Sequence, residues 1–351
     1  MVGRETRVNL LIGTNHGLSH FYQLSLPPLF LSWHDAFGAS YTELGLSVAL
    51  MLFCTGALQT PMGVLVDRHG ARPFLILGSL LMSGGMLGMA AATEFWQVLL
   101  LSAISGIGNS VIHPADYAIL SGSIRKEVIG RSFAAHTLAG NLGYAAAPAF
   151  MTALLGVMPW RSAVAVAGLL GLVAVGSIVL QSRILTDQAR PRHEGGLSVR
   201  TLFASRTPWL FFGFFMLSAM AMSGLQTWLI AVLHQVNGFD LAVGSTALTC
   251  LLVGNSAGTI LGGWVADRFS TALMGFTVGL TLATAALFGL AALIAFGPLA
   301  MMAVLALAGF AMGASRTPRD VMLKEAAPPG QIGKVFGFVS SALPFGSAAT
   351  P

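Results

Sequence analysis

Three polar side chains interrupt the first long apolar stretch of the sequence, residues 8–34. His16, His20 and Gln23 recur at helical spacing and therefore share one face of a helix. Such side chains are costly in lipid and should face a cavity or a partner helix, and histidine also titrates near physiological pH. The pattern predicts either part of a solute path or hydrogen bonding between helices. We expect no metal site, because the sequence shows no third ligand.

A repeated pattern places one carboxylate near the end of the fourth apolar stretch and another near the end of the tenth. His113-Pro-Ala-Asp116 recurs 204 residues later as Thr317-Pro-Arg-Asp320. An ionisable residue beside a membrane span is a functional candidate by default. The symmetric placement favours gating or structural ion pairs with the loop arginines Arg68, Arg72 and Arg268. Proton coupling through Asp116, with His113 close by, is the alternative.

Polar or amphipathic side chains inside two other apolar stretches could extend the same path. His136 and Asn141 lie in the fifth stretch, and Gln226 and Trp228 lie on a partly polar face of the seventh. We expect these residues to line a solute cavity together with the three polar residues of the first stretch. Hydrogen bonding between helices is the alternative role.

A short charged loop follows the second apolar stretch and reads Gly63-Val-Leu-Val-Asp67-Arg68-His-Gly70-Ala-Arg72. Gly63 allows two helices to approach closely. Asp67 can accept hydrogen bonds from a helix amino terminus and balance a neighbouring arginine. Such a cluster can hold one arrangement of helices and release it in another, so it is a candidate gate; a fixed topology anchor is the alternative. A weaker copy follows the eighth stretch: Gly263, Asp267 and Arg268.

The composition shows which kind of element must position these residues. Charged residues make up 9% of the 351 residues, against about 25% in a soluble domain. Hydrophobic residues reach 55%, and the mean hydropathy is +0.78. A soluble protein needs far more polar surface, so a cytosolic enzyme is excluded, and the 22 Phe residues oppose disorder. The chain is therefore predicted to be a polytopic membrane protein.

Stretches without charged residues define the expected spans, since an apolar helix needs about 20 residues to cross a bilayer. Eight stretches each suit one span: 8–34, 44–66, 73–93, 95–115, 132–160, 162–182, 207–239 and 241–266. The stretch 269–315 is long enough for two spans, and 335–351 begins another. Continuous rather than alternating apolar runs favour helices over a barrel. We expect ten complete spans and the start of an eleventh.

Lys and Arg residues set the expected orientation. With the amino terminus in the cytoplasm, 17 of the 18 Lys and Arg residues lie in cytoplasmic segments, Arg316 and Arg319 among them, and only Arg161 falls outside. The net charge of +5 therefore follows from topology and does not imply nucleic-acid binding. We expect a multi-pass monomer in the inner (plasma) membrane, in contact with the lipid bilayer.

The two halves of the chain repeat one another. Four pairs match at an offset of 203 residues: Gly130 and Gly333, Phe133 and Phe336, Gly143 and Gly346, and Pro148 and Pro351. We expect an N-terminal six-helix bundle over 1–182, a cytoplasmic linker over 183–206, and an incomplete C-terminal bundle over 207–351, with spans seven to ten and part of span eleven. Because the second copy stops in mid-helix, we expect the chain to be a fragment. Repeated spans are typical of transporters.

The loop at 63–72 resembles the signature G-x-L-x-D-R-x-G-x-R of the major facilitator superfamily. The match covers residue type, spacing and loop position, and the resemblance extends over the whole chain. It implies an all-α polytopic fold of two pseudo-symmetric six-helix bundles, with the chain ending within the eleventh span. It also implies that spans one, four, seven and ten line the cavity, which would place His16, His20 and Gln23 in the path.

Two further segments resemble signatures of subgroups of this family. Gly143-Tyr-Ala-Ala-Ala147-Pro148 resembles the antiporter signature G-x-x-x-G-P, with Ala147 at the second glycine. Gly106-Ile-Gly108 matches only the end of the drug-antiporter signature R-x-x-Q-G-x-G, because serines stand at the Arg and Gln positions. The run from Gly106-Ile-Gly108 to His113-Pro114, followed by Gly140-Asn141-Leu-Gly143, resembles fosmidomycin-resistance-type exporters.

These patterns predict a secondary active transporter that moves a small solute by alternating access. Proton-coupled export of a metabolite or drug is the first expectation, with protons as a possible second partner. The alternatives are an importer of small organic anions and a non-transporting sensor or assembly protein on the same fold. The sequence carries no Walker loop, no H-E-x-x-H and no G-x-S-x-G, so we expect neither an enzyme nor a cofactor.

Overall fold

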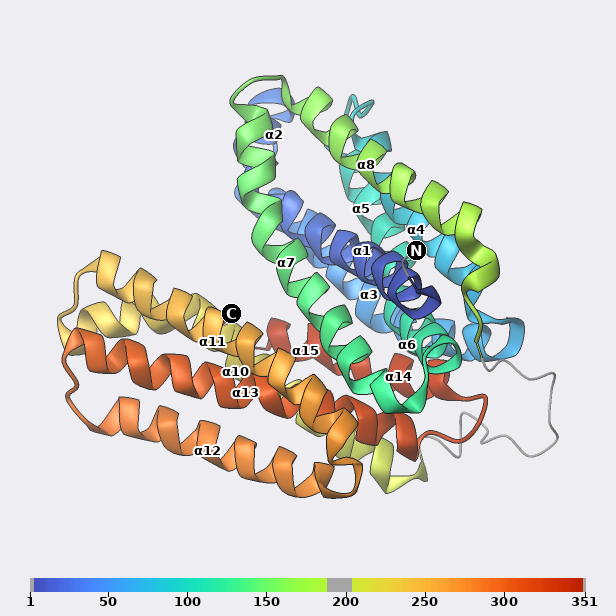
Figure 1. Cartoon of the computed structure of the whole chain (residues 1–351). Coiled ribbons are helices and arrows are strands. Elements are labelled where there is room, and N and C mark those ends of the chain that lie inside the picture. Colours follow the sequence, from blue (N-terminus) through green and yellow to red (C-terminus); the bar gives the residue numbers. More distant parts are fainter. Residues whose placement is uncertain (1–2, 188–203, 350–351) are drawn as a thin grey trace. The chain divides into compact units, whose positions relative to one another are not determined.

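The computed structural model describes residues 3–187 and 204–349, which form helices joined by short turns (Figure 1). The first half contains α1 (Arg4–Ser25), α2 (Phe30–Phe37), α3 (Tyr41–His69), α4 (Ala71–Met89), α5 (Phe95–Asn109), α6 (Ile112–Ser123), α7 (Ile129–Leu155) and α8 (Trp160–Gln181). The second half contains α10 (Arg206–Asn237), α11 (Leu241–Arg268), α12 (Leu273–Leu293), α13 (Pro298–Ala326), α14 (Ile332–Ser340) and α15 (Ala342–Ala348). Long helices form here because apolar segments must satisfy their backbone hydrogen bonds internally.

Nine helical segments within the described ranges are long and apolar enough to cross a membrane. They correspond to the second to tenth predicted spans. The first predicted span, 8–34, overlaps α1, which has 22 residues and begins at Arg4; its polar residues lower its hydropathy, and it is not among the nine. The start of the eleventh span is divided into α14 and α15 at Ser341. The structure is thus an all-α, multi-pass arrangement, as the sequence predicted.

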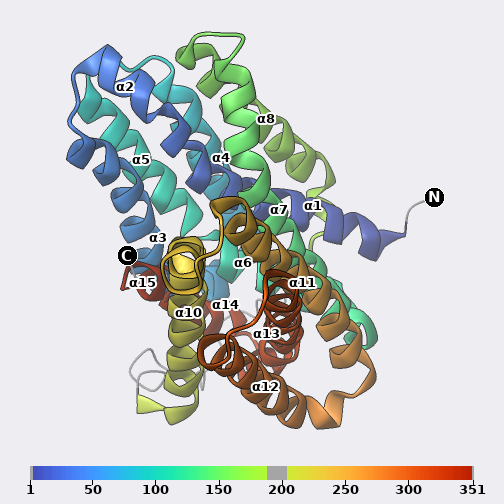
Figure 2. The ribbon, with the colours of Figure 1, turned by 90° about the vertical axis from the view of Figure 1, so that its left-hand side faces the viewer.

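The described helices group into two compact units by their contacts. Unit 1 comprises Met1–Ile124, Ala139–Phe212 and Ala327–Pro344, and unit 2 comprises Arg125–Leu138, Gly213–Ala326 and Phe345–Pro351. In unit 1, α4 packs on α5 and α8, and α14 packs on α3 and α6. In unit 2, α13 packs between α11 and α12 (Figures 1 and 2).

The predicted division at the linker follows the repeat rather than these contacts, and it stays a prediction. Residues 188–203, which make up most of the predicted linker 183–206, lie outside the described residues. The described start of the linker packs on unit 1. There the backbone N–H of Thr186 donates to Ser123 Oγ at 2.9 Å, and Asp187 accepts a hydrogen bond of 2.5 Å from the backbone N–H of Ala71.

The closest helix pair in unit 2 is built on glycines. Gly254, Gly258 and Gly262 recur every fourth residue along α11, and a Cβ at any of them would collide with a carbonyl oxygen of α13. Gly309 and Gly313 on α13 face the backbone of α11 in the same way. In a membrane, helices gain little from hydrophobic burial and associate through such close backbone packing. Figure 2 shows α11 and α13 side by side.

A turn that occurs in both halves makes the internal repeat visible in the structure. Nδ1 of His34 lies 2.8 Å from the carbonyl oxygen of Ala39, and Nδ1 of His234 lies 2.8 Å from the carbonyl oxygen of Phe239. Each turn contains a glycine at positive φ: Gly38 has a φ of 66° and Gly238 has a φ of 69°. Glycine enters this region without strain. The same local structure therefore recurs 200 residues apart.

Candidate functional site

The charged loop predicted at 63–72 joins α3 to α4 in unit 1. Gly70 has a φ of 90° and makes the turn. Oδ1 of Asp67, near the end of α3, accepts a hydrogen bond of 2.8 Å from the backbone N–H of Gly333, and Oδ2 accepts one of 2.7 Å from that of Lys334. Both donors lie in the first turn of α14, whose backbone N–H groups carry a partial positive charge. Asp67 therefore caps a helix that is distant in the sequence.

Gly63 lies beside this contact, and the close packing there requires a glycine at this motif position. A Cβ on Gly63 would collide with the carbonyl oxygen of Gly333, and one on Gly337 would lie 2.5 Å from the carbonyl oxygen of Gln59. The glycines thus bring α3 and α14 close enough for Asp67 to reach the amino terminus. The two motif arginines are exposed, and Arg72 donates a long hydrogen bond of 3.4 Å to the carbonyl oxygen of Ser182.

The weaker motif copy makes the equivalent contact within unit 2. Oδ1 of Asp267 accepts a hydrogen bond of 2.6 Å from the backbone N–H of Gly130, in the first turn of α7. Oδ2 accepts bonds from Arg131, at 3.2 Å from the backbone N–H and 2.7 Å from Nε. Gly263 again lies at the close approach, where a Cβ would meet Ala134 Cβ at 2.6 Å. Arg268 is exposed.

A polar cluster in unit 1 joins α1 to α6. Nε2 of His20 lies 3.1 Å from Nε2 of His16. The ring centroid of His113 lies 5.0 Å from that of His16 and 5.9 Å from that of His20. Nδ1 of His16 lies 3.5 Å from Oδ2 of the fully buried Asp116. Sequence reasoning found no third histidine here, because His113 is distant in the chain; α6 brings it to α1.

Residues of α7 extend this cluster. Tyr144 donates a hydrogen bond of 2.7 Å to Oε1 of Gln23, and its ring centroid lies 4.3 Å from that of His20. Gly143 faces the carbonyl oxygen of Gly17 on α1 so closely that no Cβ fits. The glycine of the predicted span-five signature is therefore required for packing, and sequence reasoning missed Tyr144 beside it. Asn141 is half-buried on the same helix.

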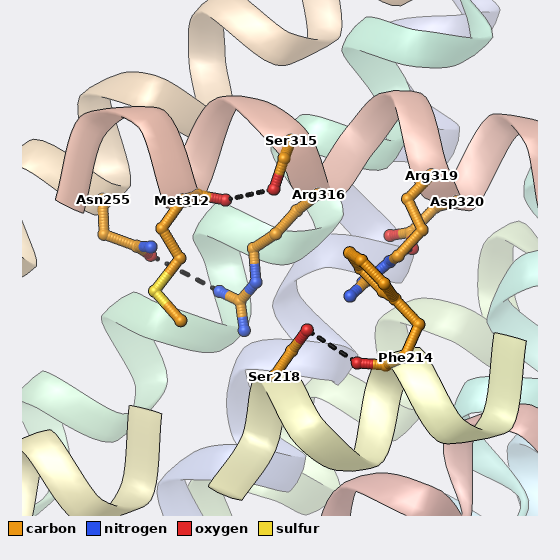
Figure 3. Close-up of polar contacts among 8 residues, drawn as sticks. All are labelled: Phe214, Ser218, Asn255, Met312, Ser315, Arg316, Arg319 and Asp320. Carbon is orange, nitrogen blue, oxygen red and sulfur yellow. Dashed lines mark hydrogen bonds and ion pairs between the residues drawn. The ribbon is translucent and has the colours of Figure 1, made fainter. Parts of the chain in front are cut away.

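A second polar cluster lies in unit 2 on α13 (Figure 3). Nη1 of Arg316 donates a long hydrogen bond of 3.4 Å to Oδ1 of Asn255 on α11. Nε and Nη2 of Arg319 donate to Oδ1 of Asp320 at 2.9 and 2.8 Å. The guanidinium carbon of Arg319 lies 3.6 Å from the ring centroid of Phe215, within range of a cation–π interaction.

The structure corrects one sequence interpretation of these charged residues and leaves another as a prediction. We expect Arg316 and Arg319 on the cytoplasmic side, and that side stays a prediction; both lie inside the 29-residue helix α13, and Arg319 is only 6% exposed. We also expected Asp116 and Asp320 to pair with arginines of the motif loops. Asp116 instead faces His16, and Asp320 pairs with Arg319. A buried carboxylate partner lets a helix hold an arginine away from a loop, as Asp320 does for Arg319.

The remaining candidates for the solute cavity differ in how far their side chains are buried. His136 on α7 is 3% exposed and interacts electrostatically with Asp320 in unit 2. Gln226 and Trp228 on α10 are exposed, Trp228 by 54%. The structure therefore brings His136 to the α13 cluster and does not bring Gln226 or Trp228 there.

Comparison with known proteins decides the family. The sequence profile of the Major Facilitator Superfamily matches residues 15–351. This chain belongs to the Major Facilitator Superfamily. That membership confirms the predicted helical fold and the prediction that the chain is not an enzyme; the exporter subgroup stays a prediction.

Individual relatives within the superfamily are distant. The chain is 26% identical over 292 residues to the probable L-galactonate transporter of Escherichia coli K12, an alignment that covers 76% of this chain and 64% of the relative. It is 30% identical over 107 residues to the multidrug resistance protein MdtH of Cronobacter sakazakii, covering 30% of this chain and 27% of the relative. The aligned parts thus span under two thirds of these relatives.

Solved structures of the superfamily share the fold of this chain. The proton:xylose symporter XylE matches with a TM-score of 0.72 at 15% identity, covering 99% of this chain and 87% of XylE. The human organic anion transporter MFSD10 matches with a TM-score of 0.72 at 18% identity, covering all of this chain and 93% of that protein.

Proposed function

We propose that this protein is a secondary transporter that carries a small organic anion across the membrane by alternating access. The observation that carries the proposal is Arg316, an arginine inside the apolar helix α13 that reaches Asn255 on α11. An ionisable side chain within a span is costly and marks a solute or ion pathway. Guanidinium binds carboxylate through two parallel hydrogen bonds, so Arg316 suits a carboxylate solute.

The surrounding residues favour a polar anion over a purely apolar drug. The amide of Asn255 offers both a donor and an acceptor for hydroxyl groups. Asp320 already neutralises the charge of Arg319, so Arg319 contributes little to the electrostatic attraction of an anionic solute. Relatives add support, since one is named a probable L-galactonate transporter and another an organic anion transporter.

The two capping carboxylates supply the gate in this proposal. Asp67 and Asp267 hold the first turns of α14 and α7 through charge-assisted hydrogen bonds. Each bond joins a motif loop to a helix that belongs to the other sequence repeat. Forming and releasing such bonds lets a transporter alternate between states that differ by a few kcal/mol. Protons, coupled through Asp116 and His16, are the second transported species in this proposal.

A transport assay with purified full-length protein in proteoliposomes tests the proposal. Vesicles preloaded with unlabelled galactonate should take up labelled galactonate, and labelled xylose should enter far more slowly. Arg316→Gln should lower galactonate uptake about ten-fold or more, since a charged hydrogen bond contributes roughly 1.5–3 kcal/mol. Arg206→Gln, the same change at an exposed position of α10, is the matched control. Equal uptake by Arg316→Gln and wild type would remove Arg316 from the solute site.

Export of a metabolite or drug is the second candidate, favoured by the match to MdtH over 107 residues. Direction is read from vesicles with an imposed pH gradient. The proposed topology places the amino terminus on the cytoplasmic side of the plasma membrane. Solute that leaves the cytoplasmic compartment while protons enter it supports export. Uptake with protons supports import. A lack of transport of organic anions, sugars and drugs supports the non-transporting sensor or assembly role.

A further inference from the structure

Three histidine side chains converge in unit 1 between α1 and α6. One ring nitrogen from each of His16, His20 and His113 can be chosen so that all three lie within 4.8 Å of one another. His16 is 3% exposed, and the other two are half-buried. Helical spacing places the two α1 rings one turn apart on one face, and α6 supplies the third. Imidazole nitrogen is the preferred ligand of divalent zinc, nickel, cobalt and copper.

The spacing of the nitrogens suits tetrahedral coordination. Two nitrogens bound to zinc at the usual distance of about 2.0–2.1 Å lie roughly 3.3 Å apart in a tetrahedral site. The Nε2 atoms of His16 and His20 are 3.1 Å apart. A ring nitrogen of His113 lies within 4.8 Å of the other two, so it needs to approach by no more than about 1.5 Å to reach that same separation, which rotation of its half-buried ring can supply. Three histidines leave one of the four positions open for water or an anion.

Asp116 occupies the place of an outer partner to such a site. Its carboxylate lies 3.5 Å from Nδ1 of His16, on the opposite side of the ring from the Nε2 that faces His20. A carboxylate that accepts the Nδ1 proton fixes the tautomer in which Nε2 carries the lone pair. When ionised, Asp116 also offsets the cost of holding a dication among buried groups.

Gly140 on α7 provides the space for the two α1 rings. A Cβ at this position would lie 2.6 Å from Cδ2 of His20 and 2.8 Å from Nε2 of His16. Both distances are shorter than ordinary van der Waals contact, so any other residue would push the rings from their place. The same helix presents Tyr144 beside His20, which limits the other direction of movement.

We propose that His16, His20 and His113 bind a divalent transition-metal ion of the zinc class, with Asp116 as a positioning residue behind His16. Sequence reasoning excluded a metal for want of a third ligand, and the packing of α6 on α1 supplies that ligand. The site does not include Arg316, but it shares His16 and Asp116 with the proton coupling proposed above. It binds metal whether or not the protein carries an organic anion.

Metal binding to the full-length protein, purified with a tag that contains no histidine, tests the site. Competition with a fluorescent zinc chelator should give one Zn²⁺ per chain, and Co²⁺ should give the visible absorption of a tetrahedral site. His16→Gln, His20→Gln and His113→Gln should each weaken zinc binding at least 100-fold, and Asp116→Asn should weaken it about 10- to 100-fold. His69→Gln, the same change at an exposed histidine on α3, should leave binding unchanged.

Correct folding of each variant is checked separately, by its elution volume in size exclusion and by its apparent melting temperature in the presence of chelator. Zn²⁺ should raise the melting temperature of wild type and of His69→Gln by mass action, and not that of the three histidine variants. If a Gln variant does not fold, the corresponding Asn variant and Gly140→Ala replace it, the latter expected to weaken zinc binding by displacing both rings. Wild-type protein that binds no Zn²⁺, or histidine variants that bind as wild type does, would overturn the proposal.

Discussion

Asp67 accepts a hydrogen bond of 2.8 Å from the backbone N–H of Gly333, a residue 266 positions away in the chain. The equivalent carboxylate of the second repeat, Asp267, accepts one of 2.6 Å from Gly130. Gly130 and Gly333 are themselves equivalent in the repeat, at an offset of 203 residues. Each repeat therefore caps a helix that begins in the other. Capping by a carboxylate is favourable because the helix amino terminus is electropositive.

Loss of this charge should impair the transport cycle while leaving the fold intact. Asp67→Asn keeps the shape of the side chain but replaces a charge-assisted acceptor with a neutral amide, which costs about 1 kcal/mol at a helix cap. We expect the exchange rate in preloaded proteoliposomes to fall several-fold. Glu43→Gln is the matched control, because Glu43 also accepts a hydrogen bond at a helix amino terminus, from the backbone N–H of Ser40, but at the start of its own helix α3. An unchanged exchange rate for a folded Asp67→Asn protein would show that the contact is only a topology anchor.

The close approach at Gly63 should be intolerant of even one methyl group. A Cβ at Gly63 would fall on the carbonyl oxygen of Gly333, and overpacking of this kind costs roughly 1–3 kcal/mol. Gly63→Ala should therefore lower the apparent melting temperature in detergent. Gly84→Ala on α4, where a Cβ meets nothing within 4 Å, should be neutral or slightly stabilising. Equal melting temperatures for the two variants would contradict the close approach of α3 and α14.

The buried ion pair on α13 should show strong coupling between its members. Asp320→Asn leaves the guanidinium of Arg319, 6% exposed, without its carboxylate, and breaking a buried pair in this way costs about 3–5 kcal/mol. The double change Arg319→Gln with Asp320→Asn removes both charges and should be less destabilising than Asp320→Asn alone. Thermal unfolding of Asp320→Asn, of Arg319→Gln and of the double variant measures the coupling. Additive losses would show that the two charges act independently.

Asp116 should separate proton coupling from solute exchange. Asp116→Asn removes the titratable carboxylate beside His16 and leaves the Arg316 cluster of unit 2 untouched. We expect exchange of solute across preloaded vesicles to persist and uptake driven by a pH gradient to fall at least several-fold. Both rates are measured on the same vesicle preparation. If gradient-driven uptake survives in full, Asp116 is not the proton carrier.

Much of the architecture could be predicted from local sequence. Charge-free stretches of about 20 residues determine membrane helices, and nine described helices follow them. The motif also predicted a loop after the second apolar stretch, and the structure turns there at Gly70, whose positive φ ends α3 and starts α4. The internal repeat was readable from offsets in the chain, since equivalent residues keep equivalent local structure, as at His34 and His234.

The site depends on information that is not local. Three contacts join residues far apart in the chain: His113 beside His16, Gly333 beneath Asp67, and Asn255 beside Arg316. The sequence by itself determined which residue types lie on which helix, because lipid selects apolar length and local backbone geometry selects turns. Only the tertiary structure decided which helix faces meet. That choice depends on the rotation and packing of each helix against several neighbours, and glycines without a Cβ decide how close those neighbours come.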